Sequence, residues 1–591
     1  MKPIELSDNA LAVLRSRYLI RDRELKIVET PCDLFRRVAG YIAQAELISG
    51  NPADADRWEE VFFEMMIARD FLPNSPTLMN AGTSLGQLSA CFVIPVEDTI
   101  EGIFEAIKEM ALVQRTGGGT GFSFSKLRPA SDPIVSTGGQ ASGPVSFMKI
   151  FDCATTHIKQ GGKRRGANMG VLRVDHPDIL DFIRAKKDSQ ALRNFNLSVS
   201  VTDSFMNALM AKDSYDLVHP ADGRVTARIK AMDVFQEIIQ AAWETGDPGL
   251  LFVDSINRAN PTPHIGPIEA TNPCGEIPLL NYESCNLGSL NLAHMLEDDG
   301  GKVDTDKLLS TVRSSVRFLD NVISMNRYPI QEIQTVTEGN RKIGLGVMGF
   351  SEMLIRMGIS YDSQEAEQIG SHIMELINNQ AFAASCELAI ERGSYPNWKG
   401  SVHDRQGSYI RNATRTAIAP TGTIGIIADT TPSIEPLFAL AYRRMNVLEN
   451  KELKEVNRLF SEYADHYHLN TDHLVEQIME KGNLREVEGI PESMKRIFKT
   501  ALEIPADRHL KIQAAFQRHV DNSVSKTINM PKNATPSDVA EAYLRAWQMG
   551  LKGITIYRYG SRSEQVLQLG IKERAYHYDY GSKCDPEECR I

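Results

Sequence analysis

The stretch TNPCGEIPLLNYESCNLGSLNL, residues 271–292, places two cysteines in one short segment. Cys274 stands between Asn272 and Glu276, and Cys285 follows eleven positions later. In an extended chain, side chains at positions i, i+2 and i+4 point the same way, and the following proline favours extended backbone at Asn272. We therefore expect one face to offer a hydrogen-bond donor, a nucleophilic or one-electron sulfur, and a general base.

The pentapeptide NPCGE alone also fits a surface loop with a buried structural cysteine and a solvated glutamate. Gly275 would let the backbone approach a ligand closely. A cysteine protease would need a histidine partner, and none lies within the pentapeptide, His264 being the nearest in sequence.

Length and composition leave the function class open. A chain of 591 residues predicts several domains or one large α/β body. The net charge of −11 gives no global attraction for nucleic acid. We expect a cytoplasmic protein, because we find no signal peptide and no apolar run long enough for a membrane span. The eight cysteines are too sparse for a disulfide scaffold, so they are expected to be buried, metal-binding or catalytic.

The apolar pattern changes along the chain. Residues 1–70 show helical spacing, whereas residues 71–565 alternate short apolar runs, glycine turns and amphipathic segments, which predicts an α/β body. LRNFNLSVSV reads as a strand, and RKIGLGVMGFSEMLIRMG reads as a strand, a glycine turn and a helix. Polar helices are expected near 445–465 and 470–505. The tail, residues 566–591, has no packing pattern and is expected to be mobile.

Further motifs accompany the cysteine segment in a fixed order, and together they resemble ribonucleotide reductases, most closely the adenosylcobalamin-dependent (class II) enzymes. The resemblance covers about residues 70–565 and rests on PNSPTLMNAGTSLGQLSACFVIPVEDTIEGIF, RTGGGTGFSFSKLRP, SGPVSFMKIFD, KQGGKRRGANMGVLRVDHPDI, NPCGE with ESCNLGSLNL, RKIGLGVMGFSE, IAPTGTIGIIADT, DNSVSKTINMP and KGITIYRYGSR. It implies a ten-stranded α/β barrel, made of two antiparallel halves of five parallel strands, around a finger loop that carries Cys274. A helical region (1–70) would precede the barrel (71–565) and a flexible tail (566–591) would follow it.

The resemblance also implies a reaction, the radical removal of the 2′-hydroxyl of a ribonucleotide, for which a cofactor or partner must generate the radical. Cys274 would become a transient thiyl radical, Glu276 the general base, and Asn272 a hydrogen-bond partner of the substrate hydroxyls. Cys91 and Cys285 would be the redox dithiol, which supplies two electrons while closing to a disulfide. The alternative for Cys91 is a buried strand cysteine.

The remaining cysteines divide into a tail pair and three without a motif. Cys584 and Cys589 resemble the family's shuttle dithiol, which would carry electrons from an external reductant such as thioredoxin or a glutaredoxin. The alternative is half of a zinc site, with only His577 near in sequence. Cys32, Cys153 and Cys386 are expected in the core.

Nucleotide contacts follow from the resemblance as well. The substrate site would comprise the catalytic segment and a phosphate turn, and the effector site would adjoin a mobile specificity loop, KQGGKRRG. The alternatives are an ordinary strand-to-helix turn and a solvated charged loop. Gly425 replaces a serine that is usual in the family. The implied substrate contacts are Ser75, Ala90, Cys91, Gly118, Asn272, Pro273, Cys274, Gly275, Glu276, Pro420, Thr421, Gly422, Thr423 and Ile424, and the effector contacts are Asp98, Lys126, Arg128, Lys159 and Gln160.

The radical source is expected to be adenosylcobalamin. Relatives with a metal-containing subunit carry adjacent tyrosines, whereas here Arg558 separates Tyr557 from Tyr559. The glycine motif of glycyl-radical relatives does not occur, no cobalamin contacts can be named, and we expect no protein metal ligands. The alternatives are a large subunit driven by a separate di-metal protein and a non-catalytic nucleotide-binding regulator.

The chain is expected to form a homodimer that acts on diphosphates. Deoxynucleotide or ATP effectors would control it, but an N-terminal ATP cone is not expected. We expect it to bind neither nucleic acid nor membrane.

Overall fold

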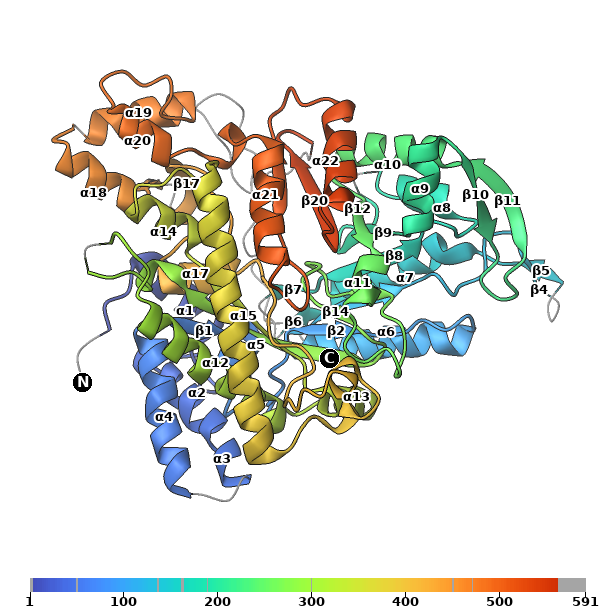
Figure 1. Cartoon of the computed structure of the whole chain (residues 1–591), viewed down its shortest axis with the longest axis horizontal. Coiled ribbons are helices and arrows are strands. Elements are labelled where there is room, and N and C mark those ends of the chain that lie inside the picture. Colours follow the sequence, from blue (N-terminus) through green and yellow to red (C-terminus); the bar gives the residue numbers. More distant parts are fainter. Residues whose placement is uncertain are drawn as a thin grey trace. The chain divides into compact units, whose positions relative to one another are not determined.

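The structure is a computed structural model in which residues 4–48, 52–134, 138–160, 164–188, 190–298, 300–448, 451–469 and 471–561 are described. The chain divides into two compact units, Met1–Phe438 with Ala501–Glu564, and Ala439–Thr500 with Gln565–Ile591. Figure 1 follows the chain from its helical start through the strands of the first unit.

The chain begins with a helical region, as predicted. Its helices are α1 (Asp8–Arg17), α2 (Pro31–Ala43), α3 (Ala45–Ile48) and α4 (Pro52–Ile67). A capping box between Thr30 and Asp33 fixes the start of α2, because each side chain satisfies an otherwise unpaired backbone N–H of the other residue. The short strand β1 (Phe71–Pro73) and helix α5 (Ser75–Asn80) lead into the sheet.

Five parallel strands form the first half of the sheet. They run side by side in the order β2 (Cys91–Val93), β3 (Gly119–Ser123), β8 (Asn168–Arg173), β9 (Phe195–Val201) and β12 (Gly249–Phe252). The predicted strand in LRNFNLSVSV is β9. The helices between and after these strands are α6 (Ile100–Arg115), α7 (Gly143–His157), α8 (Ile179–Arg184), α9 (Asp203–Ala211), α10 (Ala231–Thr245) and α11 (Val253–Arg258).

The second half is built in the same way. Strand β15 (Glu283–Asn291) pairs in parallel with β16 (Ile343–Met348), and parallel bridges Leu345↔Thr416 and Ile418↔Val524 continue the sheet through residues 414–418 to 522–524. From there the chain enters β19 (Thr527–Met530), which pairs in parallel with β20 (Gly553–Arg558). The associated helices are α12 (Thr305–Met325), α13 (Gln331–Asn340), α14 (Phe350–Arg356), α15 (Gln364–Arg392), α16 (Val402–Arg405), α17 (Gly422–Ala428), α21 (Ala506–Gln517) and α22 (Pro536–Gln548).

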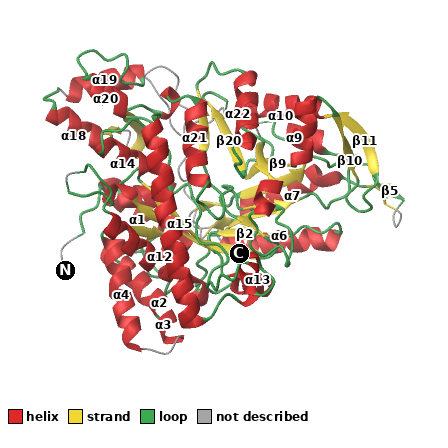
Figure 2. Ribbon diagram, viewed as in Figure 1, coloured by secondary structure: helices red, strands yellow, loops and turns green. Residues whose placement is uncertain are grey.

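Two antiparallel seams close the halves into a barrel. Cys285 of β15 lies opposite Cys91 of β2, and Leu250 of β12 lies opposite Ile554 of β20. This arrangement confirms the predicted ten-stranded barrel. Every residue of β15 and β16 is buried, as expected for parallel strands covered on both faces. Figure 2 shows helices such as α9, α10 and α22 outside the strands.

The first unit also contains four two-stranded hairpins among its described residues. They are β4 (Pro133–Ile134) with β5 (Gly139–Gln140), β6 (Lys159–Gln160) with β7 (Arg164–Arg165), β10 (Ser214–Val218) with β11 (Val225–Lys230), and β13 (Ala270–Thr271) with β14 (Pro278–Leu279). Short 3-10 turns occupy Leu292–His294, Pro396–Trp398 and Ala501–Glu503.

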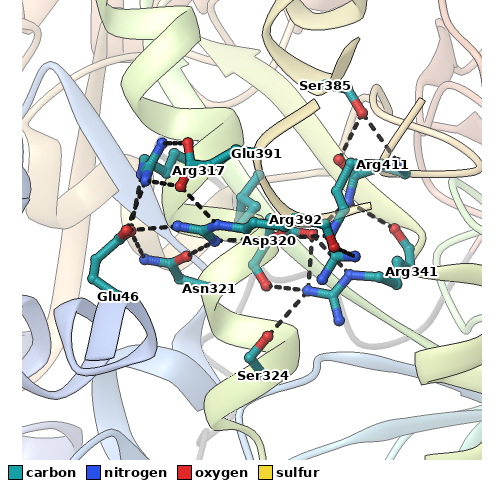
Figure 3. Close-up of polar contacts among 12 residues, drawn as sticks. Glu46, Arg317, Asp320, Asn321, Ser324, Arg341, Ser385, Glu391, Arg392 and Arg411 are labelled. Carbon is teal, nitrogen blue, oxygen red and sulfur yellow. Dashed lines mark hydrogen bonds and ion pairs between the residues drawn. The ribbon is translucent and has the colours of Figure 1, made fainter. Parts of the chain in front are cut away.

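A buried ion network ties the helical region to the barrel helices (Figure 3). Arg392 of α15 bonds Glu46 of α3 at 2.6 Å, and Arg341 bonds Asp320 of α12 at 2.8 Å. Although burial alone would raise the pKa of Asp320, Arg341, Arg411 and Arg392 lower it to about 2. Buried charges need such partners, so this network fixes how α3, α12 and α15 meet.

The second unit contains a hairpin of β17 (Ala441–Leu448) and β18 (Lys451–Val456), followed by α18 (Arg458–His466), α19 (Thr471–Lys481) and α20 (Glu492–Ile497). The helix predicted from residue 445 was therefore wrong for its first part. Strand pairing overrides the helix propensity of the Lys, Leu and Glu residues in KELKEV. The helical prediction holds from Arg458 onward for α18 to α20.

Candidate active site

The central loop is a tight turn and not an extended segment. Gly275 N–H donates to the Asn272 carbonyl at 3.1 Å, and Gly275 has φ +81°, a conformation that glycine adopts without strain. Asn272 N–H in turn donates to the Ile277 carbonyl at 3.2 Å, at the end of the β13–β14 hairpin. The predicted alternation of side chains is therefore wrong, because Pro273 and Cys274 occupy the corner of a turn.

Both halves of the barrel hold this loop. Asn196 Nδ2 of β9 donates to the Pro273 carbonyl at 2.8 Å, and Ser523 N–H donates to the Glu276 carbonyl at 2.9 Å. A Cβ on Gly121 of β3 would lie 1.8 Å from the Thr271 carbonyl oxygen, so only glycine permits this approach. The hairpin thus lies against the strands, as expected of a finger loop.

The turn separates its three polar side chains by exposure. Asn272 and Glu276 are buried, whereas Cys274 at the tip is exposed. Asn272 uses its Oδ1 to accept from Ile277 N–H at 3.0 Å and its Nδ2 to donate to Cys91 Sγ at 3.1 Å. The Asn272 side-chain amide therefore holds both the turn and the Cys91 thiol in place.

Glu276 is a buried carboxylate. Its Oε2 is buried without a hydrogen-bond partner among the described residues. Burial raises the pKa of Glu276 to about 7, against a smaller opposing effect of Asn272. A carboxylate with a pKa near neutrality can accept and release a proton at working pH, which suits a general base.

Cys91 and Cys285 face each other across the β2–β15 seam. Directly opposed residues in an antiparallel pair have Cα atoms roughly 4.5–5.5 Å apart, which is within the range that a disulfide spans. Both are buried thiols here. Burial raises the pKa of both, with Glu276 adding to the effect at Cys91 and Glu283 at Cys285. The fold therefore brings together two cysteines 194 positions apart in a pairing that the sequence alone could not show.

The predicted phosphate turn lies at the start of α17. Thr421 has φ +51° and its Oγ1 accepts from Ser433 N–H at 2.7 Å, so its hydroxyl oxygen is already engaged, whereas Gly422 is exposed. Pro420 and Thr423 are half-buried. The last apolar part of IAPTGTIGII forms helix α17. The first N–H groups of a helix lack internal acceptors and can bind an anion.

Position 425, where the family usually has serine, is buried glycine in this helix. A Cβ there would meet Thr430 O at 3.4 Å and Pro432 Cα at 3.6 Å, which are ordinary contacts. A serine would therefore fit, and its hydroxyl would lie toward residues 430–432.

Ser75 begins α5, and its Oγ lies 2.7 Å from the hydroxyl of Tyr18 at the end of α1. Sequence reasoning missed Tyr18, because no local pattern links positions 57 residues apart. The Ala90 carbonyl accepts from Gly119 N–H at 2.8 Å, and Gly119 lies beside Pro273. Gly118 packs against Phe92 and Val113, and a Cβ at this position would overlap both side chains.

The predicted effector residues fall into two groups. Arg128 bonds both oxygens of Asp98, through Nε at 2.7 Å and through its backbone N–H at 3.1 Å, and Lys126 bonds Glu97 at 3.0 Å. Asp98 and Arg128 thus come together just before α6. Lys159 and Gln160 form β6, but their side chains lie outside the described part of the structure, as do residues 161–163 of the loop.

The other cysteines give one correction. Cys153 is exposed on α7 and not in the core, while Cys32 and Cys386 are half-buried beside apolar clusters. Cys584 and Cys589, with His577, lie outside the described residues. Among the described residues, no group of three or more His, Cys, Asp or Glu side chains could hold a metal ion, and no helix is long and apolar enough to cross a membrane.

Comparison with known proteins agrees with this geometry. The family model "Ribonucleotide reductase, barrel domain" matches residues 89–410 and 405–557, and "Ribonucleotide reductase, all-alpha domain" matches residues 4–86. A solved structure, the Actinobacillus ureae class Id ribonucleotide reductase alpha subunit, shares the fold with a TM-score of 0.76 at 24% identity, covering 94% of this chain and 97% of that one.

Curated relatives are similar over most of the chain. A protein of Thermoplasma acidophilum named vitamin B12-dependent ribonucleoside-diphosphate reductase is 49% identical, covering 96% of this chain and 81% of the relative. A Mycobacterium tuberculosis protein of the same name is also 49% identical, covering 95% and 81%. A ribonucleoside-diphosphate reductase subunit alpha of Chlamydia muridarum is 30% identical, covering 96% and 60%. The chain therefore belongs to the ribonucleotide reductase family.

Proposed function

We propose that the chain is an adenosylcobalamin-dependent reductase that converts ribonucleoside diphosphates to 2′-deoxyribonucleotides through a thiyl radical at Cys274. The observation that carries the proposal is the site itself, an exposed thiol on a loop tip whose flanking Asn272 and Glu276 are buried. The opposed Cys91 and Cys285 supply a dithiol beside it. The substrate class follows the names of the Thermoplasma and Mycobacterium relatives.

The residues divide the chemistry among them. The Cys274 sulfur radical takes the 3′ hydrogen atom of the ribose, and Glu276 accepts the 3′-hydroxyl proton. The 2′-hydroxyl leaves as water, and Cys91 and Cys285 supply two hydrogens as they close to a disulfide. Cys274 then returns its hydrogen atom to the 3′ carbon, and Glu276 returns its proton to the 3′ oxygen. Because Cys274 is exposed in the chain alone, bound substrate and cofactor would have to cover the loop tip to keep solvent from the radical.

The described residues fit the cofactor. The Cys274 side chain is exposed, and a Cβ on Gly275 would meet no atom within 4 Å, so the loop tip borders open space. When bound, adenosylcobalamin would supply a carbon-centred radical from its cobalt–carbon bond. Cys274 would present its S–H to that radical, and Asn272 and Glu276 would stay on the buried side of the loop.

The nucleotide contacts extend this proposal. The substrate phosphates would bind the turn from Pro420 to Ile424 and Ser75, with Ala90, Gly118 and the loop from Asn272 to Glu276 beside the ribose. A deoxynucleotide or ATP effector would bind near Asp98, Lys126 and Arg128 in a homodimer. Lys159 and Gln160 would then carry the effector's influence to the substrate base.

The tail cysteines would supply electrons to the active-site dithiol. Cys584 and Cys589 would reduce the Cys91–Cys285 disulfide and be reduced in turn by thioredoxin or a glutaredoxin. The helical region 1–70, the barrel 71–565 and the tail 566–591 would act as one catalytic chain in the cytoplasm.

An anaerobic assay tests the proposal. The purified chain is mixed with a dithiol and either CDP or CTP, with and without adenosylcobalamin, and no second protein is added. Deoxynucleotide formed from CDP only in the presence of the cofactor supports the proposal. Activity that requires a separate metal-containing subunit would overturn the cofactor assignment, and nucleotide binding without any turnover would indicate a regulator.

A further inference from the structure

A cavity lies at the end of the barrel away from the proposed phosphate turn. Its volume is about 260 Å³, and its walls include Arg258, Asn260, His403, Thr414, Asp521 and Lys552. Thr414, Asp521 and Lys552 immediately precede strands of the second half, whereas Thr421 follows one. Residues 258–261 follow β12 of the antiparallel first half. These segments meet at the same end because the two halves run in opposite directions.

Lys552 is a buried cation in the wall of this cavity, with 8% of its surface exposed. Its Nζ donates to the backbone carbonyls of Asp521, at 2.6 Å, and Asn522. No carboxylate of the described residues lies within ion-pair distance of it. Burial lowers the pKa of Lys552 to about 8, with Lys342 adding to the effect and Asp521 opposing it. A buried ammonium held only by carbonyl dipoles has an incompletely compensated charge.

The neighbouring charges are already matched. Asp521 accepts from Arg415 Nη2 at 2.6 Å and from Arg415 N–H at 2.8 Å. Lys342 lines a small neighbouring pocket that shares Asp521 and Lys552 with the cavity, and it bonds Glu283 at 2.7 Å. Arg258 at the rim bonds Asp203 at 2.5 Å. These four cations, Lys552 included, face three carboxylates, which leaves one positive charge.

The neutral groups leave donors for a ligand. Thr414 Oγ1 accepts from Asn522 Nδ2 at 3.1 Å, so its own hydroxyl hydrogen remains to be donated. His403 bonds Tyr395 at 3.0 Å, and burial and Arg415 lower the pKa of His403 to about 4, so it is uncharged at neutral pH. The cavity volume is below the roughly 300–1,000 Å³ typical of drug-sized ligands, which favours a small ligand over a nucleotide.

We propose that this cavity binds a small oxyanion, with Lys552 as its charge partner, the Thr414 hydroxyl as a second donor and Arg258 at the rim. Phosphate and small carboxylates share the required chemistry. None of Lys552, Thr414 and Arg258 belongs to the proposed substrate or effector contacts, so the site stands or falls independently of the proposed activity.

Calorimetric titration of the full chain tests the proposal, with inorganic sulfate as the first probe in buffer free of other multivalent anions. We expect Lys552→Met to weaken binding at least tenfold, Lys552→Arg to keep it within about threefold, and Lys26→Met, at an exposed lysine of the helical region, to leave it unchanged. Phosphate and succinate titrations then distinguish the two sources of oxyanion. Unchanged sulfate binding by the Lys552→Met variant, or none by the wild type at 10 mM, would overturn the proposal.

A second readout needs no substitution. Sulfate does not titrate near pH 8, so proton uptake on binding reports the protein. Binding beside Lys552 should take up a fraction of a proton, and the uptake should increase from pH 7 to pH 9, measured in buffers of different ionisation enthalpy. Binding without proton uptake would place the anion elsewhere and refute the assignment.

Discussion

Replacing Glu276 by Gln should abolish turnover and make the protein more stable at alkaline pH. The carboxyl is buried, and its pKa of about 7 exceeds its ordinary value of 4.5. The native state therefore holds this proton more tightly than the unfolded state. The resulting stability is present below about pH 4.5 and is lost as the pH rises through 7.

The size of the effect follows from the shift. At 1.36 kcal/mol for each pKa unit, the ionised Glu276 costs about 3 kcal/mol at pH 8 and under about 1 kcal/mol at pH 5. With an unfolding entropy of roughly 2.1 cal/mol/K per residue, 3 kcal/mol raises the melting temperature of a chain of this length by about 2 °C. Glutamine has a similar shape and no charge, so the variant should not show this pH dependence.

Melting temperatures of wild type and Glu276→Gln at pH 5 and pH 8 measure this. Glu541→Gln, at an exposed position of α22, is the matched control and should track the wild type. In the same preparations, wild-type kcat/KM should fall about tenfold per pH unit below pH 7, because the base must be ionised. A Glu276→Gln variant that melts below the wild type at pH 8, or that turns over at an appreciable rate, would refute the reasoning.

Three further changes probe other parts of the site and fold. Asn272→Ala removes the bond to Cys91 and leaves Ile277 N–H without its acceptor, so kcat should fall at least 100-fold and stability by about 1–3 kcal/mol in denaturant titration; near-normal kcat would contradict its role. Tyr18→Phe removes the partner of Ser75 and should raise the KM for CDP about fivefold with little change in kcat, a split that steady-state kinetics can test. Asp320→Asn leaves Arg341, Arg392 and Arg411 without their shared carboxylate and should cost about 3–5 kcal/mol of unfolding free energy, whereas a loss below 1 kcal/mol would show that the network is dispensable.

The barrel was predicted from the resemblance of the sequence motifs to ribonucleotide reductases. The strands were predicted from their apolar runs, which arise because strands such as β16 are buried on both faces. It could not place Cys91 opposite Cys285, since strand register across 194 positions depends on the closure of the barrel. Pro273 and Cys274 do not follow the predicted alternation of side chains, because Gly275 makes a turn that an extended-chain prediction does not include. The helix predicted near 445–465 is absent from its first part, residues 445–456. Pairing between β17 and β18 outweighs the helix propensity of these residues.

We propose that the Cys274 sulfur starts the reaction and that Cys91 and Cys285 supply its electrons. The direct measurement uses a Cys584→Ser/Cys589→Ser background, reduced beforehand, with adenosylcobalamin and CDP but no external dithiol, and it counts both dCDP and the Cys91–Cys285 disulfide by mass spectrometry. We predict one dCDP and one disulfide per chain, and neither when Cys274→Ser is added. Product formed without Cys274, or without that disulfide, would contradict the account.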